Sequence, residues 1–303
     1  MQIMNKQETI NQSNRTFNKW KGIWSDNVDE NLKSFSKFTI DEEKRNGDSV
    51  IILAYGPSFT RNIDKIKELK LHHKHDIICV DKALKGVLKN KIIPRAVVSS
   101  DARIKISECL NIDEFDVSLV KRISLFVCVT SHPSWAKFWK ENGGTIHFYI
   151  NKDAIGTQRE YRDRFNYDPE KGDQKAFSLP AAVNVANTAY TICVLKLQYK
   201  VIMLAAFDYS FKYWGNYYGE ECYNDKHRDL KASKKNVDNQ IHVIDVNNNI
   251  VQTSHSMLFS ARWLINFVSA VSQQQQVKTI NITGEGILFL PHQARLREVS
   301  NAA

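Results

Sequence analysis

Three runs of apolar residues follow one another between positions 49 and 101, and polar residues come directly after each of them. The runs cover residues 49–55, 76–80 and 95–98, and amphipathic or short helix-like segments separate them. Strands that are apolar throughout and alternate with helices are typical of a parallel sheet covered on both faces. Such sheets bind ligands outside the carboxyl ends of their strands, so the polar residues there predict a binding site. A nucleotide or another phosphorylated compound is the expected ligand.

The rest of the chain continues this alternation of strand and helix. Further apolar runs cover residues 125–130, 145–150, 201–207 and 278–283. A β-hairpin is predicted at residues 241–251, turning at a run of asparagines. We therefore expect an α/β fold. It has a doubly wound, mostly parallel, Rossmann-like sheet with helices on both faces, plus a β-hairpin and irregular lid segments.

Composition divides the chain into three parts. Residues 1–47 are polar with scattered aromatic side chains, and they predict a helical arm that packs on its own domain or on a sister subunit. Residues 48–290 form the α/β domain, and residues 291–303 form a C-terminal tail. Within the domain, residues 151–177 and 209–240 are irregular and rich in charged and aromatic side chains. Long irregular stretches are often binding loops, so we expect lids here, with solvated excursions as the alternative.

The totals are those of a globular protein. The chain has 303 residues, of which 43% are hydrophobic and 25% are charged. No apolar run approaches the ~18 residues that cross a bilayer, and the opening residues lack the apolar core of a signal peptide. Five cysteines lie far apart, which is typical of neither a disulfide framework nor a zinc site. A cytoplasmic location is therefore expected.

The net charge of +9 and the pI of about 9.2 favour an anionic partner. The lysines are spread along the chain without a long basic block, so a phosphate-bearing substrate is favoured over nucleic acid. Four well-known motifs are missing: GxxxxGKS/T, GxGxxG, HExxH and GxSxG. Their absence argues against a P-loop kinase, an ordinary dinucleotide-dependent dehydrogenase, a zincin and an α/β-hydrolase.

The residues that follow the first strand form the first candidate site. Gly56, Pro57 and Ser58 make a tight turn before the next helix. Glycine permits close backbone approach, and N–H groups at a helix start attract anions. The hydroxyl of Ser58 can bond a phosphate or a ribose, so the turn predicts part of a nucleotide site.

Asp81, Asp101 and Asp208 each close a buried strand. Carboxylates gathered at one edge of a sheet can bind a divalent cation, orient ribose hydroxyls or cap the following helices. Capping is favoured for Asp81, and a functional role is favoured for Asp208.

Three histidines are candidates for lining the cleft or for catalysis. His132 follows a strand and precedes a helix, so we expect it to line the cleft. His255 lies beside Ser256 at the start of a helix, where a general base can be oriented. His227 lies in the second irregular segment, from which it can reach over the cleft. Surface or capping roles are the alternative for His227 and His255.

With these residues in view, the chain resembles the DUF115, or MptE-like, family from about Val50 to Gly286. The strongest parts are Gly56-Pro57-Ser58, the stretch from Asp76 to Asp101, and Ser131-His132-Pro133. That family includes the archaeal enzyme that adds diphosphate to 6-hydroxymethyl-dihydropterin. It also includes motility accessory factors that are linked to glycosylation of flagellin.

The family is similar in layout to the bacterial sialyltransferases that use CMP-sialic acid. Those enzymes hold the cytidine nucleotide with an Asn-Gly-Pro-Ser loop, whereas Tyr55 stands here in place of the asparagine. They use a histidine followed by serine as base, which His255-Ser256 resembles. In the accessory factors a glycine-rich serine segment precedes the long helix, and Ser178-Leu179-Pro180 replaces it here.

The residues and the resemblance together imply roles. The catalytic candidates are His255, Asp208 and His227. Nucleotide binding is expected from Gly56, Pro57, Ser58, Asp81, Lys82, Asp101, Ser131, His132 and Ser178. If the reaction depends on Mg²⁺, Asp101 and Asp208 are the expected ligands.

These roles predict a transferase that uses a nucleotide-activated donor. A glycosyltransferase that moves a sugar from a CMP- or other nucleotide sugar to an acceptor hydroxyl is favoured. The alternatives are an ATP- and Mg²⁺-dependent diphosphokinase of the pterin type, or a non-catalytic module that binds anions or nucleic acid. The acceptor stays open among protein, glycan, small molecule and modified DNA, and a homo-oligomer is an open possibility.

Overall fold

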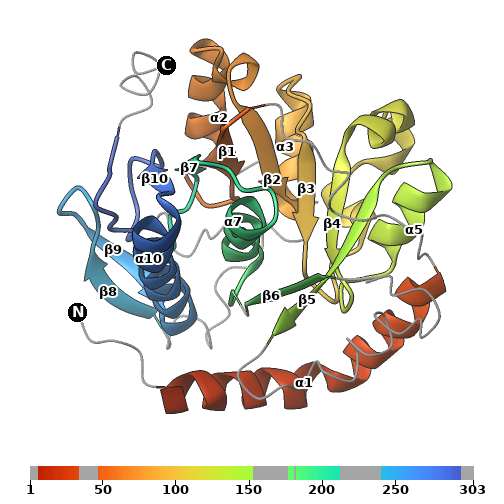
Figure 1. The fold of residues 1–303 in the computed structure, drawn as a ribbon, viewed down its shortest axis with the longest axis horizontal. Helices are drawn as coiled ribbons and strands as arrows, with labels where there is room; N and C mark the ends of the chain where they lie inside the picture. Colours follow the sequence, from red (N-terminus) through yellow and green to blue (C-terminus); the bar gives the residue numbers. More distant parts are fainter. Residues whose placement is uncertain (1–5, 34–46, 153–176, 181, 212–239, 295–303) are drawn as a thin grey trace.

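The computed structural model describes residues 6–33, 47–152, 177–180, 182–211 and 240–294 (Figure 1). Its main sheet has eight strands in the order β10-β7-β1-β2-β3-β4-β5-β6, and every neighbouring pair is parallel. This confirms the α/β fold with a Rossmann-like sheet. The strands are β1 (Ser49–Leu53), β2 (Asp76–Val80), β3 (Ala96–Ser99), β4 (Ser124–Cys128), β5 (Ile146–Lys152), β6 (Phe177–Pro180), β7 (Val201–Ala205) and β10 (Lys278–Asn281).

Helices connect these strands and cover the sheet on both faces. The α-helices are α1 (Lys6–Lys33), α2 (Phe59–Glu68), α3 (Leu84–Lys89), α4 (Ile106–Cys109), α5 (Ser134–Glu141), α7 (Val185–Leu195) and α10 (His255–Gln275). Short 3-10 turns are η2 (Leu71–His73), η3 (Asp81–Ala83), η4 (Ile112–Glu114) and η5 (Val117–Arg122). Within the described residues, no helix combines the length and the apolar character that crossing a membrane requires.

Alternating side chains of the strands build one core on each face of the sheet. Ile51 and Leu53 of β1 belong to a buried cluster with residues of α2, α3 and α5. Val50 and Ile52 belong to a second cluster with residues of α7 and α10. Because both faces are buried, the strands are apolar throughout, which is why they were recognisable in the sequence.

The direction of the chain reverses beside β1. From β1 the chain builds outward on one side through β2, β3, β4, β5 and β6, and then returns to place β7 and β10 on the other side. The connections after β1 and β7 therefore leave in opposite directions. In open parallel sheets, a crevice for ligands forms at this point, outside the carboxyl ends of the two strands.

Helix α1 lies along the carboxyl ends of the strands (Figure 1). The amide of Asn27 donates to the carbonyls of Ala102 and Thr130 at 2.9 and 3.0 Å. The buried amide of Asn31 donates to the carbonyls of Val129 and Ser131 at 3.0 and 2.9 Å. These bonds join the helix to the loops after β3 and β4.

A two-stranded antiparallel hairpin, β8 (Gln240–Ile244) and β9 (Ile250–Ser254), stands apart from the main sheet. It matches the hairpin predicted at residues 241–251. The carboxylate of Asp245 accepts the N–H groups of Asn247 and Asn249, both at 2.8 Å, and so stabilises the turn. Most of the two predicted lids, residues 153–176 and 212–239, and residues 295–303 of the predicted tail lie outside the described residues.

Candidate ligand-binding site

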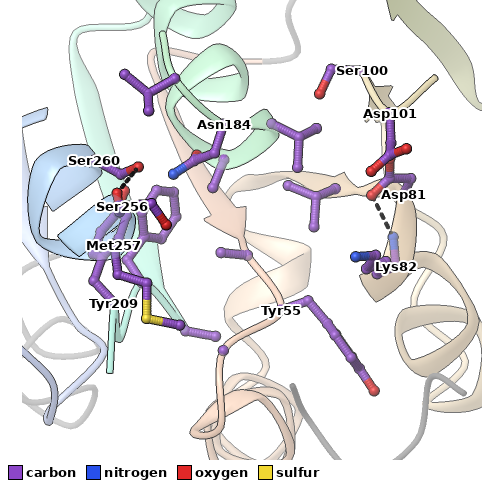
Figure 2. A pocket seen from close by; sticks show the side chains of 18 of the residues that line it. Tyr55, Asp81, Lys82, Ser100, Asp101, Asn184, Tyr209, Ser256, Met257 and Ser260 are labelled. Atoms are coloured by element: carbon purple, nitrogen blue, oxygen red, sulfur yellow. Dashed lines mark hydrogen bonds between the residues drawn. The ribbon is translucent and has the colours of Figure 1, made fainter. Parts of the chain in front are cut away.

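A cavity of about 480 Å³ opens at the carboxyl ends of β1, β2, β3 and β7, at the point where the chain reverses direction. The loops after these strands, the amino ends of α7 and α10, and helix α1 line it. Figure 2 shows Asp81, Lys82 and Asp101 on one side of the cavity. Ser256, Met257 and Ser260 lie on the other, and Asn184 lies between the two groups.

The cavity gathers six of the twelve predicted site residues around one space. Its lining includes Gly56, Pro57, Asp81, Lys82, Asp101 and Asp208. Ser58 lies behind this lining, where it is buried and contacts Asp208. The strand-end aspartates and the Gly-Pro-Ser turn therefore meet at one edge of the sheet.

Asp208 is the most unusual carboxyl group of the site. It is 2% exposed, and its Oδ2 accepts the Ser58 hydroxyl at 2.8 Å and the Ser58 N–H at 3.4 Å. Burial raises its pKa to about 7, and the charge of Glu285 adds to the rise while the Ser58 bonds oppose it. A carboxyl group with this pKa exchanges a proton near neutral pH, as a general acid or base must.

The turn after β1 packs tightly around Asp208. A Cβ at Gly56 would lie 2.0 Å from Asp208 Oδ2 and 2.7 Å from the Ala206 carbonyl oxygen. The N–H of Gly56 donates to the Ala206 carbonyl at 3.1 Å, and that of Phe59 donates back to Gly56 at 3.0 Å. The sequence predicted these N–H groups as anion donors, but they already bond protein acceptors. The close approach that Gly56 permits is that of the Asp208 carboxylate.

Asp81 is also buried, and each of its carboxylate oxygens accepts a hydrogen bond. Its Oδ1 accepts the Lys82 N–H at 2.8 Å, and its Oδ2 accepts the Ser99 hydroxyl at 3.1 Å. Burial raises its pKa to about 6, while the charge of Lys82 opposes the rise. Asp101 is exposed at the rim, and its Oδ1 accepts the Arg103 N–H at 2.8 Å. The two aspartates thus differ in role, because Asp81 shapes the loop and Asp101 faces solvent.

Asp101 and Asp208, the predicted Mg²⁺ ligands, follow strands that are not neighbours in the sheet. They follow β3 and β7, which are three strand positions apart in the sheet. At about 4.8 Å per position, the two strand ends are about 14 Å apart. Oxygen ligands of Mg²⁺ lie about 2.1 Å from the ion, so a shared ion would require the two loops to converge beyond the strand ends. Among the described residues, no group of three or more His, Cys, Asp and Glu side chains has metal-site geometry.

Two helix amino ends border the cavity. The side chain of Asn184 caps α7 by accepting the Asn187 N–H at 2.9 Å, and that of Ser254 caps α10 by accepting the Met257 N–H at 3.3 Å. The other N–H groups of a first turn have no partner within the helix. The helix dipole adds partial positive charge at the same place. Together with Lys82, these ends offset the negative charge of the aspartates.

The model of one protein family matches residues 24–213, which is more than half of the chain. Its description is "6-hydroxymethylpterin diphosphokinase MptE-like". The chain belongs to this family. The resemblance read from the sequence is thereby confirmed, and membership supports a transferase in general.

One solved structure similar to this MptE-like chain is the MAf glycosyltransferase from Magnetospirillum magneticum AMB-1. The TM-score is 0.60 at 14% sequence identity, and the match covers 90% of this chain but 38% of that one. At this identity the similarity shows a shared fold. No curated protein matches the chain.

Several residues predicted for the site lie outside the cavity lining of the MptE-like domain. His255 is exposed at the start of α10, although the next residue, Ser256, lines the cavity. Ser131 is buried and donates to the Ser99 carbonyl at 3.1 Å. His132 bonds Ser134 at 2.9 Å, and burial lowers its pKa.

Two further candidates cannot be placed in the site. His227 lies outside the described residues. Ser178 belongs to strand β6, and its side chain is not among the described ones.

The cavity also includes residues that sequence reasoning missed. Trp20 and Trp24 of α1 line one wall, and the guanidinium of Arg103 lies 4.2 Å from the Trp20 ring centroid. Their presence in a polar segment predicted docking, but the sequence did not indicate where the segment docks. Asn184 carried a usable signal, because asparagine is a preferred residue directly before a helix.

Proposed function

We propose that the chain is a glycosyltransferase that moves a sugar from a nucleotide sugar to an acceptor hydroxyl. The observation that carries this proposal is the buried Asp208 carboxyl group in a cavity at the reversal point of a parallel sheet. Sheets of this kind bind nucleotides at that point. The structurally similar MAf protein is named a glycosyltransferase, which supports the same chemistry here.

The donor fits the positive side of the cavity. In this proposal the Lys82 ammonium and the amino end of α7 hold the phosphate oxygens of the donor. Asp101 accepts hydrogen bonds from ribose hydroxyls at the rim. Trp20 and Trp24 offer flat apolar surfaces on which a nucleobase can stack.

Asp208 is the proposed general base, in place of His255. The acceptor hydroxyl gives its proton to the Asp208 carboxylate, and the acceptor oxygen forms a bond to the anomeric carbon of the donor sugar. The bond from that carbon to the phosphate oxygen breaks, and the electron pair leaves with the nucleotide. A positioned base contributes ~10²–10⁴-fold in rate. The placement of Asp208 in the lining, and of His255 outside it, supports this choice.

A thermal-shift panel tests the proposal. CMP, UDP, GDP, ATP and a set of CMP-, UDP- and GDP-sugars are added to the full chain with and without Mg²⁺. Ligands that bind the folded state raise Tm, so at least one nucleotide sugar should raise it. Lys82→Ala should weaken that ligand at least tenfold, whereas the exposed Lys89→Ala of α3 should not. The proposal fails if no nucleotide sugar raises Tm.

The family description favours one alternative, a pterin-type diphosphokinase. There the diphosphate of ATP moves to the hydroxymethyl oxygen of the acceptor, and AMP leaves. EDTA separates the two functions, because removal of Mg²⁺ abolishes diphosphate transfer, whereas glycosyl transfer to Asp208-activated hydroxyls continues. A non-catalytic module would instead show salt-sensitive nucleic-acid binding and no nucleotide turnover.

A further inference from the structure

A second cavity, of about 750 Å³, lies directly beside the first. Pro57, Asp208 and Ser210 line both cavities, so Asp208 lies where the two cavities adjoin. The hairpin of β8 and β9 and the loop that contains Glu285 and Gly286 form the other sides. A buried carboxyl group between two cavities can contact a ligand in each.

The charges of the two cavities differ. The described lining of the second cavity contains the carboxyl groups of Asp208, Asp245 and Glu285 and no lysine or arginine. Arg61 pairs with Glu285 at 3.0 Å from outside this lining. The first cavity also contains three aspartates, but Lys82 and two helix amino ends offset their charge there. A phosphate is therefore disfavoured in the second cavity by repulsion from its carboxylates.

The remaining polar groups of the second cavity suit hydroxyl groups. The amides of Asn249 and Gln252 can both donate and accept hydrogen bonds, and the imidazole of His242 adds further hydrogen-bonding nitrogen atoms. Phe211 adds an apolar ring surface. Relying on the function proposed above, we propose that the second cavity is the acceptor subsite and takes an uncharged, polyhydroxylated molecule such as a sugar.

Hydrogen bonds hold the hairpin to the loops after β7 and β10. The Phe211 N–H donates to the Gln252 carbonyl at 2.8 Å, and the Val246 N–H donates to the Gly286 carbonyl at 2.9 Å. The Asn247 amide donates to the Gly284 carbonyl at 3.0 Å. A wall fixed in this way is preorganised, so an acceptor loses little affinity to loop ordering.

This arrangement brings the two substrates together beside Asp208, where the two cavities adjoin. The acceptor hydroxyl in the second cavity gives its proton to the Asp208 carboxylate, and its oxygen bonds the anomeric carbon of the donor in the first. The nucleotide then leaves with the electron pair through the first cavity. Neither substrate has to pass the other.

The matched variants are Gln252→Trp and Ile244→Trp. Gln252 lines the second cavity, and an indole at this position would fill part of it. Ile244 lies on the same hairpin, is 59% exposed and is not part of the lining, so Ile244→Trp is the control. His242→Trp is a second filling variant, because His242 faces Gln252 across the hairpin and is exposed.

The experiment measures binding by saturation-transfer NMR on the full chain, with methyl glucoside, methyl galactoside and glucose 6-phosphate as probes. We expect the methyl glycosides to bind the natural chain and Ile244→Trp more strongly than glucose 6-phosphate does. Gln252→Trp and His242→Trp should reduce glycoside binding at least fivefold while the nucleotide-sugar thermal shift is retained.

Retention of that thermal shift shows that a variant is folded and that the donor site is intact. The inference is overturned if neither glycoside binds, if the filling variants bind as well as the control, or if glucose 6-phosphate binds best. None of these results bears on the donor site, which the nucleotide-sugar thermal shift tests separately. Failure of the proposed function would instead appear as the absence of any nucleotide-sugar shift.

Discussion

Asp208 combines burial, a hydroxyl partner and a position between two cavities. Burying a carboxylate costs free energy, and one hydroxyl and one long N–H bond offset only part of that cost. The native state therefore favours the protonated form, which is why the pKa is raised to about 7. A group that opposes folding when it is charged is a reason to infer function, because selection for stability alone would replace it.

The first prediction concerns Asp208→Asn and the free energy of unfolding. The carboxyl pKa is 3.8 in the unfolded reference and about 7 in the fold. Protonated Asp208 therefore stabilises the fold fully below pH 4, and this contribution is lost as the pH rises through about 7. Asparagine avoids this loss, so the variant should be more stable than the natural chain by about 2–4 kcal/mol at pH 8. Urea unfolding at pH 4, 6 and 8 measures the difference.

The exposed Asp113→Asn is the control for this series. Its stability should stay within about 0.5 kcal/mol of the natural chain at each pH. If the stability difference between Asp208→Asn and the natural chain did not grow with pH, ionising Asp208 would not destabilise the fold, and the raised pKa would be contradicted.

The second prediction is that alanine at Gly56 and at Gly22 changes the free energy of unfolding in opposite directions. A Cβ at Gly56 would lie 2.0 Å from a buried carboxylate oxygen, whereas a Cβ at Gly22 would have nothing within 4 Å. Gly56→Ala should therefore lower the free energy of unfolding by at least about 2 kcal/mol through overpacking. Gly22→Ala, in the middle of α1, should raise it by up to about 1 kcal/mol. Chemical denaturation of both variants is the measurement, and equal effects would contradict the packing around Asp208.

At the scale of elements, helix α1 forms a wall of the cavity although it lies 75 to 103 residues before the loops that it contacts. Two asparagine amides join it to four carbonyls of the loops after β3 and β4. The tryptophans that line the cavity lie on the same helix, between 3 and 11 residues before these asparagines. The position of the aromatic wall therefore depends on those side-chain bonds.

Asn31→Ala tests this dependence. The substitution removes the side-chain amide that donates to the Val129 and Ser131 carbonyls. Leaving buried acceptors without a donor lowers the free energy of unfolding by about 1–3 kcal/mol. We expect trypsin to cut α1 faster and nucleotide-sugar affinity to fall, while Asp26→Ala, at an exposed position, changes neither. Unchanged cleavage and affinity in Asn31→Ala would show that α1 is held by other contacts.

The sequence predicted the elements better than their arrangement. The strands were visible because both sheet faces are buried, and Asp81, Asp101 and Asp208 marked their carboxyl ends. The docking of α1 was not visible, because it depends on side-chain bonds across about 100 residues of sequence. The base was assigned to His255 from a two-residue pattern, whereas the helix register places Ser256 in the lining. The second cavity depends on long-range bonds of the hairpin, for which no local pattern exists.

At the scale of the whole molecule, the reversal of the chain beside β1 creates the site. Because β1 and β7 are neighbours whose connections diverge, Gly56 and Asp208 meet there from 152 residues apart in sequence. The net charge of +9 is not concentrated in the site, whose described lining holds three aspartates and one lysine. The proposed substrates therefore rest on the residues that line the cavities and not on the net charge.

Hydrogen–deuterium exchange with and without a saturating nucleotide sugar tests the location of the donor site most directly. The full chain is used, with the nucleotide sugar that raises Tm most. We predict slower exchange in the loops after β1, β2 and β7 and at the amino end of α7, with no change in α5. Protection confined to α5 and the β4–β5 side of the sheet would contradict a donor site at the reversal point, and so would the absence of any protection.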